Sequence, residues 1–98
     1  MPFENSLAHA FTPSSIRNHA PVASGVYGIS NSHEWIYIGE TDNIQGKLLT
    51  HLQELGTPLL TRQPKGFVYE LCTLGVRMGR HDRLVTEYGP ICNRTTSR

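Results

Sequence analysis

The chain has few cysteines, little excess charge and no long hydrophobic run, and each shortage removes a class of protein. Its 98 residues include only Cys72 and Cys92, neither with a metal-ligand partner at short spacing. This excludes a disulfide-rich scaffold, and we expect two buried, free thiols in a reducing cytoplasm. No run of about 18 apolar residues occurs, so no membrane span is predicted. The N-terminal residues, which include Glu4, are not typical of a secretory signal.

The charge is nearly balanced overall but unevenly distributed. A formal net charge of +1 argues against strong nonspecific binding of nucleic acid by the chain as a whole. Five of the nine Lys and Arg residues, however, lie near the C-terminus: Arg77, Arg80, Arg83, Arg94 and Arg98. This local excess predicts contact with a polyanion such as DNA through Arg77, Arg80 and Arg83. The alternative is a solvated helix face followed by a charged tail.

The hydrophobic pattern predicts one small α+β domain. Residues 25–30, 35–39 and 67–72 are rich in β-branched and aromatic side chains, which is typical of strands. Apolar residues at helical spacing predict one helix from about 43 to 55 and a second that ends at 88. The order β-β-α-β-α predicts a three-stranded antiparallel sheet flanked by helices. The first helix is expected to be capped by Thr41 or Asp42.

The segments outside this pattern are expected to be an arm and a tail. Residues 1–22 are interpreted as an N-terminal arm that packs on the domain, with a short helical turn capped by Thr12 or Ser14. Residues 23–94 form the domain, and 95–98 are a frayed tail. Within the second strand, simple alternation places Trp35 on the face of Tyr37 and puts Ile36 on the opposite face.

Two triplets at a fixed spacing give the most specific signal. Gly25-Val26-Tyr27 is followed ten residues later by Tyr37-Ile38-Gly39, and the second helix leads into Tyr88-Gly89-Pro90-Ile91-Cys92-Asn93. Together with Leu48 and His51 on the first helix, these residues resemble the GIY-YIG nuclease family over positions 23–94. The resemblance implies a small sheet on which the two tyrosines lie close together.

The resemblance also implies a chemistry, namely hydrolysis of DNA phosphodiesters with a divalent metal ion such as Mg²⁺ or Mn²⁺. Tyr27 would then act as base or position the water, and Tyr37 would orient the phosphate or the water. His51 would contact phosphate or transfer a proton. Asn93 and Gly39 would support the site. The alternative is that both tyrosines are half-buried strand residues whose hydroxyls are satisfied.

Two positions depart from the family pattern. Lys47 stands where the family has an essential Arg, so the charge is kept but the two-pronged grip on phosphate is lost. His81 stands at the position of the metal-binding Glu, on the helix face directed to the sheet, and Asp82 is a weaker substitute on a different face. A neutral imidazole does not replace a carboxylate for Mg²⁺.

These departures leave two hypotheses. One is a metal-dependent DNA endonuclease in which Tyr27, Tyr37, Lys47 and His51 are catalytic and His81 or Asp82 holds the metal. The other is an inactive GIY-YIG-like module that binds nucleic acid, a protein partner or a second copy of itself.

Overall fold

The computed structural model describes residues 8–32, 34–53 and 63–90. In chain order its elements are β1 (His9–Ala10), α1 (Pro13–His19), β2 (Gly25–Ser30), β3 (Trp35–Thr41), α2 (Ile44–Gln53), β4 (Gly66–Leu71) and α4 (Leu74–Tyr88). The α+β class is confirmed, and each predicted strand and helix has a counterpart. No helix in the described ranges is long and apolar enough to cross a bilayer.

The sheet has four strands in the order β1-β4-β2-β3, so the predicted count of three was wrong. All neighbouring strands are antiparallel. The additional strand, β1, pairs His9 with Phe67 and Ala10 with Gly66. A strand of two residues is too short to show alternation, so its existence depends on the contact with β4 and not on a local pattern.

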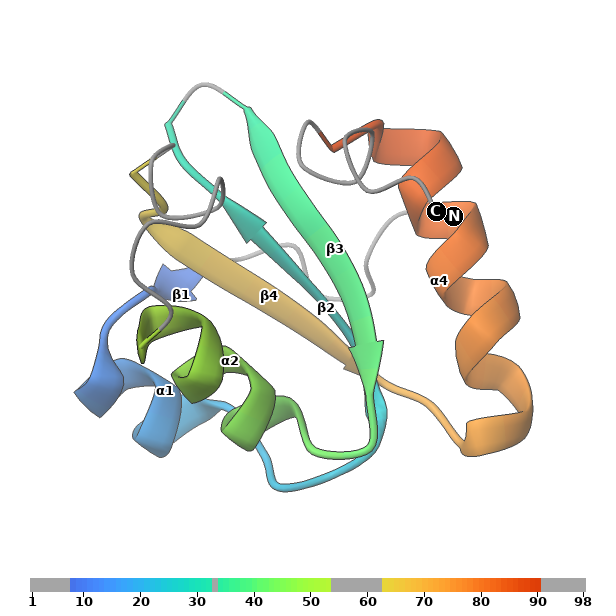
Figure 1. Cartoon of the computed structure of the whole chain (residues 1–98), viewed down its shortest axis with the longest axis horizontal. Coiled ribbons are helices and arrows are strands. Elements are labelled where there is room, and N and C mark those ends of the chain that lie inside the picture. Colours follow the sequence, from blue (N-terminus) through green and yellow to red (C-terminus); the bar gives the residue numbers. More distant parts are fainter. Residues whose placement is uncertain (1–7, 33, 54–62, 91–98) are drawn as a thin grey trace.

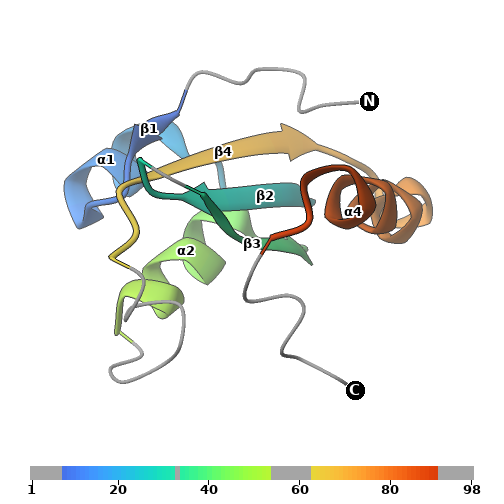
Figure 2. The ribbon, with the colours of Figure 1, turned by 90° about the horizontal axis from the view of Figure 1, so that it is seen from above.

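The helices cover the two faces of the sheet unequally. α1 and α2 lie on one side, and α4 runs beside β3 on the other (Figure 1). The view from above shows α4 well apart from the pair of helices (Figure 2). Two apolar clusters correspond to these faces. The first joins Ile16 and Leu48 to Ile29, and the second joins Leu84 to Val26.

The described part of the expected arm, residues 8–22, contributes to the core. α1 starts at the predicted cap, because Thr12 Oγ1 accepts a hydrogen bond from the Ser15 backbone N–H at 3.2 Å. Phe11, Ile16 and Ala20 are buried in the first apolar cluster. Residues 8–22 therefore pack against the sheet and α2, while residues 1–7 and the predicted tail at 95–98 lie outside the described ranges.

A bulge changes the orientation of Trp35. Ile29 is opposite Tyr37, and the next pair is Ser30 with Trp35, so Ile36 is the extra residue in β3. Ile36 consequently joins the cluster beneath α2, together with Tyr37. Trp35 instead packs on the α4 side, with its ring 4.6 Å from that of Tyr88. The expectation that Trp35 and Tyr37 share a face was wrong for this reason.

The turn into α2 uses a different cap from the two expected. Asn43 Oδ1 accepts a hydrogen bond from the Gly46 N–H at 3.0 Å. Thr41 Oγ1 accepts one from the Asn43 N–H at 3.1 Å, which holds the turn. A Cβ at position 46 would lie 2.6 Å from Asn43 Nδ2. Gly46 therefore makes room for the capping side chain, which offsets the low helix propensity of glycine.

Candidate functional site

The two triplets meet at Tyr27 and Gly39. These residues are directly opposite each other in the pairing of β2 with β3. The aromatic ring of Tyr27 crosses the α-carbon of Gly39, and a Cβ built at position 39 would overlap the hydroxyl and ring of Tyr27. Glycine at this position is thus required by the tyrosine on the neighbouring strand. The packing gives a physical reason for the two triplets to occur together.

A polar ring cluster forms around this contact beneath α2. Tyr27 Oη lies 2.7 Å from His51 Nε2, a hydrogen-bonding distance. The Tyr37 ring is 6.1 Å from that of Tyr27 and 5.5 Å from that of His51, measured between centroids. Tyr27 is fully buried, whereas Tyr37 and His51 are partly exposed. The structure therefore brings together three of the four predicted catalytic side chains.

The fourth predicted catalytic residue, Lys47, is exposed on α2. It lies one helical turn before His51, and residues at this spacing share a helix face. No carboxylate in the described residues forms an ion pair with its ammonium group. Lys47 thus provides a solvent-accessible positive charge on the side of α2 that carries His51.

His81 lies on the other side of β3 from this cluster. Its Nε2 is 3.2 Å from the carbonyl oxygen of Ile38, the residue between Tyr37 and Gly39. Its Nδ1 is 3.3 Å from Asp82 Oδ1. The prediction that His81 faces the sheet agrees with this geometry. Asp82 itself is exposed, with 75% of its side-chain surface accessible.

The described residues do not fit a resident Mg²⁺ ion. Within residues 8–32, 34–53 and 63–90, no three His, Cys, Asp or Glu side chains gather closely enough to hold a metal. His81 and Asp82 offer one nitrogen and one carboxylate, but Mg²⁺ prefers oxygen ligands in octahedral geometry. Asn93, the predicted supporting residue, lies outside the described residues.

Two of the three arginines expected to bind nucleic acid are directed to the sheet. Arg80 donates from Nε and Nη2 to the two carboxylate oxygens of Glu70, at 2.7 and 2.8 Å. This paired hydrogen bond raises the pKa of the Arg80 guanidinium. Only 13% of the Arg80 side-chain surface and 14% of that of Glu70 are accessible. Such a desolvated pair is held in one geometry and is not available to phosphate.

Arg77 is held in a similar way. Its Nε lies 2.5 Å from Glu40 Oε1, and its Nη1 donates to Ser24 Oγ at 3.0 Å. Ser24 Oγ in turn donates to the carbonyl of Cys72. Of the three predicted contacts, only Arg83 is exposed. Sequence reasoning missed these ion pairs, although the positions of Glu40 and Glu70 on the α4 face follow from strand alternation.

Solved structures of the GIY-YIG N-terminal endonuclease domain of UvrC from Thermotoga maritima share this architecture. A variant with asparagine replaced by alanine matches at a TM-score of 0.67 and 20% identity, covering 85% of this chain and 96% of that chain. A variant with tyrosine replaced by phenylalanine gives 0.66 and 19%, with the same coverage. A second tyrosine-to-phenylalanine variant matches at a TM-score of 0.65 and 20% identity, covering 76% of this chain and 91% of that chain. Each is bound to its catalytic divalent cation.

The likeness is structural. No sequence profile of a known family matches the chain, and no curated protein matches its sequence. The agreement nevertheless extends over nearly the full length of the compared domain. The chain has the fold of the GIY-YIG endonuclease domain.

Proposed function

We propose that this chain is an endonuclease-like domain that hydrolyses phosphodiester bonds in DNA with an altered set of catalytic residues. The observation that carries the proposal is the 2.7 Å contact between Tyr27 Oη and His51 Nε2 beside the partly exposed Tyr37. A phenol and an imidazole held at this distance can orient each other and share a proton. The nuclease fold supplies the context for such a cluster.

The burial of each side chain suggests its role. Tyr27 is fully buried, so it acts through His51 as a positioning residue and does not itself touch water or phosphate. His51 is partly exposed and takes the proton of the attacking water at Nδ1, while its Nε2–H donates to Tyr27 Oη. Tyr37 donates a hydrogen bond to the phosphate, and Lys47 supplies positive charge to it. Of the roles that the resemblance implied, this proposal gives proton transfer to His51 and positioning to Tyr27.

The two candidate metal donors of this chain, His81 and Asp82, are neighbours on α4. The solved relatives hold a catalytic divalent cation, which would stabilise the leaving oxygen. In this chain His81 Nδ1 and Asp82 Oδ1 are two neighbouring donors of a kind that suits Mn²⁺ better than Mg²⁺. We therefore assign no catalytic step to a metal ion. The cytoplasmic location expected from the cysteines stays a prediction.

A second function is favoured by a different observation. The carboxylates Glu40 and Glu70 are bound to Arg77 and Arg80, so these charges are used within the domain. Lys47 also lacks the planar fork of an arginine. These features suit a domain that binds nucleic acid, a protein partner or a second copy of itself without cleaving DNA.

Nicking of supercoiled plasmid by pure protein with Mg²⁺, Mn²⁺ or Ni²⁺ separates the two functions. The hydrolase proposal requires cleavage that falls by at least about tenfold in His51→Gln and in Tyr27→Phe. Tyr69→Phe is the matched control, because Tyr69 lies on the same sheet face outside the polar ring cluster. Equal cleavage by His51→Gln would contradict the assigned base.

Absence of cleavage from a folded sample would favour the binding module. The double variant Lys47→Arg/His81→Glu then tests whether the fold itself still supports catalysis. Cleavage by this double variant, but not by the native protein, would show that the native residues at positions 47 and 81 make the domain catalytically inactive. Absence of cleavage from both proteins, with retained affinity for DNA, would support a binding function.

A further inference from the structure

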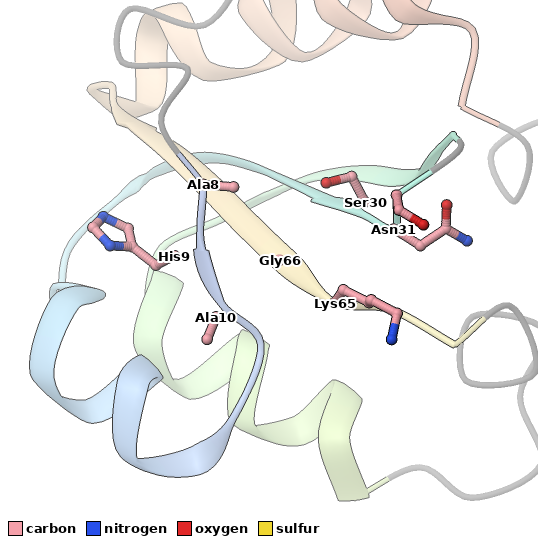
Figure 3. Close-up of a pocket in the computed structure, with 8 residues that line it drawn as sticks. Ala8, His9, Ala10, Ser30, Asn31, Lys65 and Gly66 are labelled. Carbon is pink, nitrogen blue, oxygen red and sulfur yellow. The ribbon is translucent and has the colours of Figure 1, made fainter.

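A pocket of about 310 Å³ lies where β1 meets the first residue of β4 and the last residue of β2. It extends over the strand ends at Ala10, Gly66 and Ser30, which form one row across β1, β4 and β2. Figure 3 shows Ala8 and Ser30 directed toward each other above Gly66. Tyr27 and His51 are not among its lining residues, so this pocket is separate from the polar ring cluster.

The pocket is open because its floor has almost no side chains. Ala8, Ala10 and Gly66 contribute two methyl groups and a hydrogen atom. A Cβ at Gly66 would lie 3.1 Å from the Cβ of Ala8 and 3.2 Å from the carbonyl oxygen of His9. Any larger residue at position 66 would therefore crowd β1 and displace the residues that line the pocket. Glycine here lets Ala8 and the backbone of β1 lie close against β4.

The rim of the pocket carries hydrogen-bond donors and one cation. Lys65 lies at one side, and Ser30 and Ser32 contribute hydroxyl groups. Within the described part of the chain, none of these three side chains forms a hydrogen bond or an ion pair. No acidic residue belongs to the described lining. This contrasts with Arg77 and Arg80, whose charges are matched by glutamates.

The acidic residue of the neighbouring hairpin loop, Glu34, is hydrogen-bonded within that loop. Asn31 Nδ2 donates to Glu34 Oε2 at 3.4 Å, and the Glu34 N–H donates to Asn31 Oδ1 at 2.9 Å. The Asn31 N–H also donates to the Glu34 carbonyl. The Lys65 N–H donates to the carbonyl of Ser30, which fixes the lysine backbone beside the hairpin. Among the residues that the structure describes, the ammonium of Lys65 forms no ion pair.

We propose that this pocket is a second anion site that binds a phosphate group, through the ammonium of Lys65 and the hydroxyls of Ser30 and Ser32. A lysine is a point charge that suits phosphate, and hydroxyl groups add short hydrogen bonds to its oxygens. The phosphate belongs either to a nucleic-acid strand or to a small molecule such as a free nucleotide. The site is independent of hydrolysis at the polar ring cluster.

Amide chemical-shift titration by NMR with inorganic phosphate tests the site directly. We expect the signals of Ser30, Ser32, Lys65 and Gly66 to shift together, and Lys65→Gln to weaken binding by at least about fivefold. Arg17→Gln is the matched control, because it removes one exposed positive charge from α1, far from the lining. Shifts that are absent, or equal in both variants, would overturn the proposal.

Two further titrations identify the source of the phosphate. A single-stranded thymidine octamer that binds at the same amides more tightly than inorganic phosphate indicates a nucleic-acid strand. The affinity for the octamer should then fall as the salt concentration rises. In a plot of log binding constant against log salt concentration, the slope should be smaller by about one in Lys65→Gln than in the wild type. Thymidine 5′-monophosphate that binds as tightly as the octamer indicates a free nucleotide. Failure of both ligands to shift these four amides would overturn the site, whatever the outcome of the plasmid assay.

Discussion

The two faces of the sheet handle their polar groups in opposite ways. On the face beneath α2, the phenol of Tyr27 and the imidazole of His51 hydrogen bond to each other at the edge of an apolar cluster. On the face beneath α4, Arg80 and Glu70 are formal charges that form a paired, nearly buried ion pair. The first arrangement leaves the imidazole of His51 partly exposed to solvent. In the second, the two charges neutralise each other and are largely shielded from solvent.

This difference shows that charge counted along a sequence is not charge available at a surface. The cluster of arginines toward the C-terminus predicted a nucleic-acid contact, but α4 directs two of them to glutamates on the strands. Leu74 and Met78 of the same helix are largely exposed instead. Lys47 and Lys65 are exposed, although they stand alone in the sequence and gave no cluster signal.

Breaking the ion pair on the α4 face should have the largest effect on stability. Arg80→Ala leaves the Glu70 carboxylate desolvated without a partner, which lowers the free energy of unfolding by about 3 kcal/mol. Arg83→Ala on the same helix is exposed and should change it by less than about 0.5 kcal/mol. Urea denaturation followed by circular dichroism measures both. Equal stability of the two variants would mean that the pair does not hold α4 to the sheet.

On the α2 face, Gly39→Ala should be the next most damaging change. The added methyl group must displace the ring of Tyr27, and overpacking of this kind costs about 2 kcal/mol. The control is Gly79→Ala, where nothing lies within 4 Å of the new Cβ. This second change should raise stability by about 0.5–1 kcal/mol, because alanine favours the helix. The prediction fails if the two substitutions shift the urea midpoint in the same direction.

Tyr27→Phe should lower stability only slightly but should clearly change the hydrogen bonding of the His51 ring. It removes the hydrogen bond to His51 Nε2 and should cost about 1 kcal/mol. The change is best detected in the ¹⁵N signals of the His51 ring, which report which nitrogen carries the proton. Tyr69→Phe should leave those signals unchanged. If both variants gave the wild-type His51 spectrum, the polar ring cluster would not be coupled as described.

The smallest effect is expected at the start of α1. Thr12→Ala removes the cap on the Ser15 N–H and should cost about 1 kcal/mol or less, because this cap is exposed. Ser14→Ala, in the first turn of the same helix, should be close to neutral. Thermal unfolding of the two variants side by side is sufficient. A larger loss in Ser14→Ala would show that the cap is wrongly assigned.

Much of the fold could be predicted from the sequence, because its main elements carry their own periodicity. β2, β3 and α2 follow from alternation and helical spacing, and the two triplets indicated the correct family of folds. β1 could not be predicted in this way. Its two residues become a strand only because β4 offers them an edge, and that edge is created by the folded domain.

The site was predictable to a similar degree. The grouping of Tyr27, Tyr37 and His51 followed from the resemblance, and the ring distances agree with it. The ion pairs of Arg77 and Arg80 could not be predicted. An arginine side chain has four rotatable bonds, so its partner is determined only by how the helix packs on the sheet. The displacement of Trp35 escaped prediction because one bulge residue reverses the alternation beyond it.

The contact between Tyr27 and Gly39 has a consequence for protein engineering. Because the ring of one strand occupies the space left by the missing side chain of the other, neither strand carries a complete site by itself. A graft of this chemistry onto another scaffold would have to move the whole β2–β3 hairpin as one cassette, with its register intact. Hybrid proteins that receive only one of the two triplets should pack poorly where Tyr27 contacts Gly39.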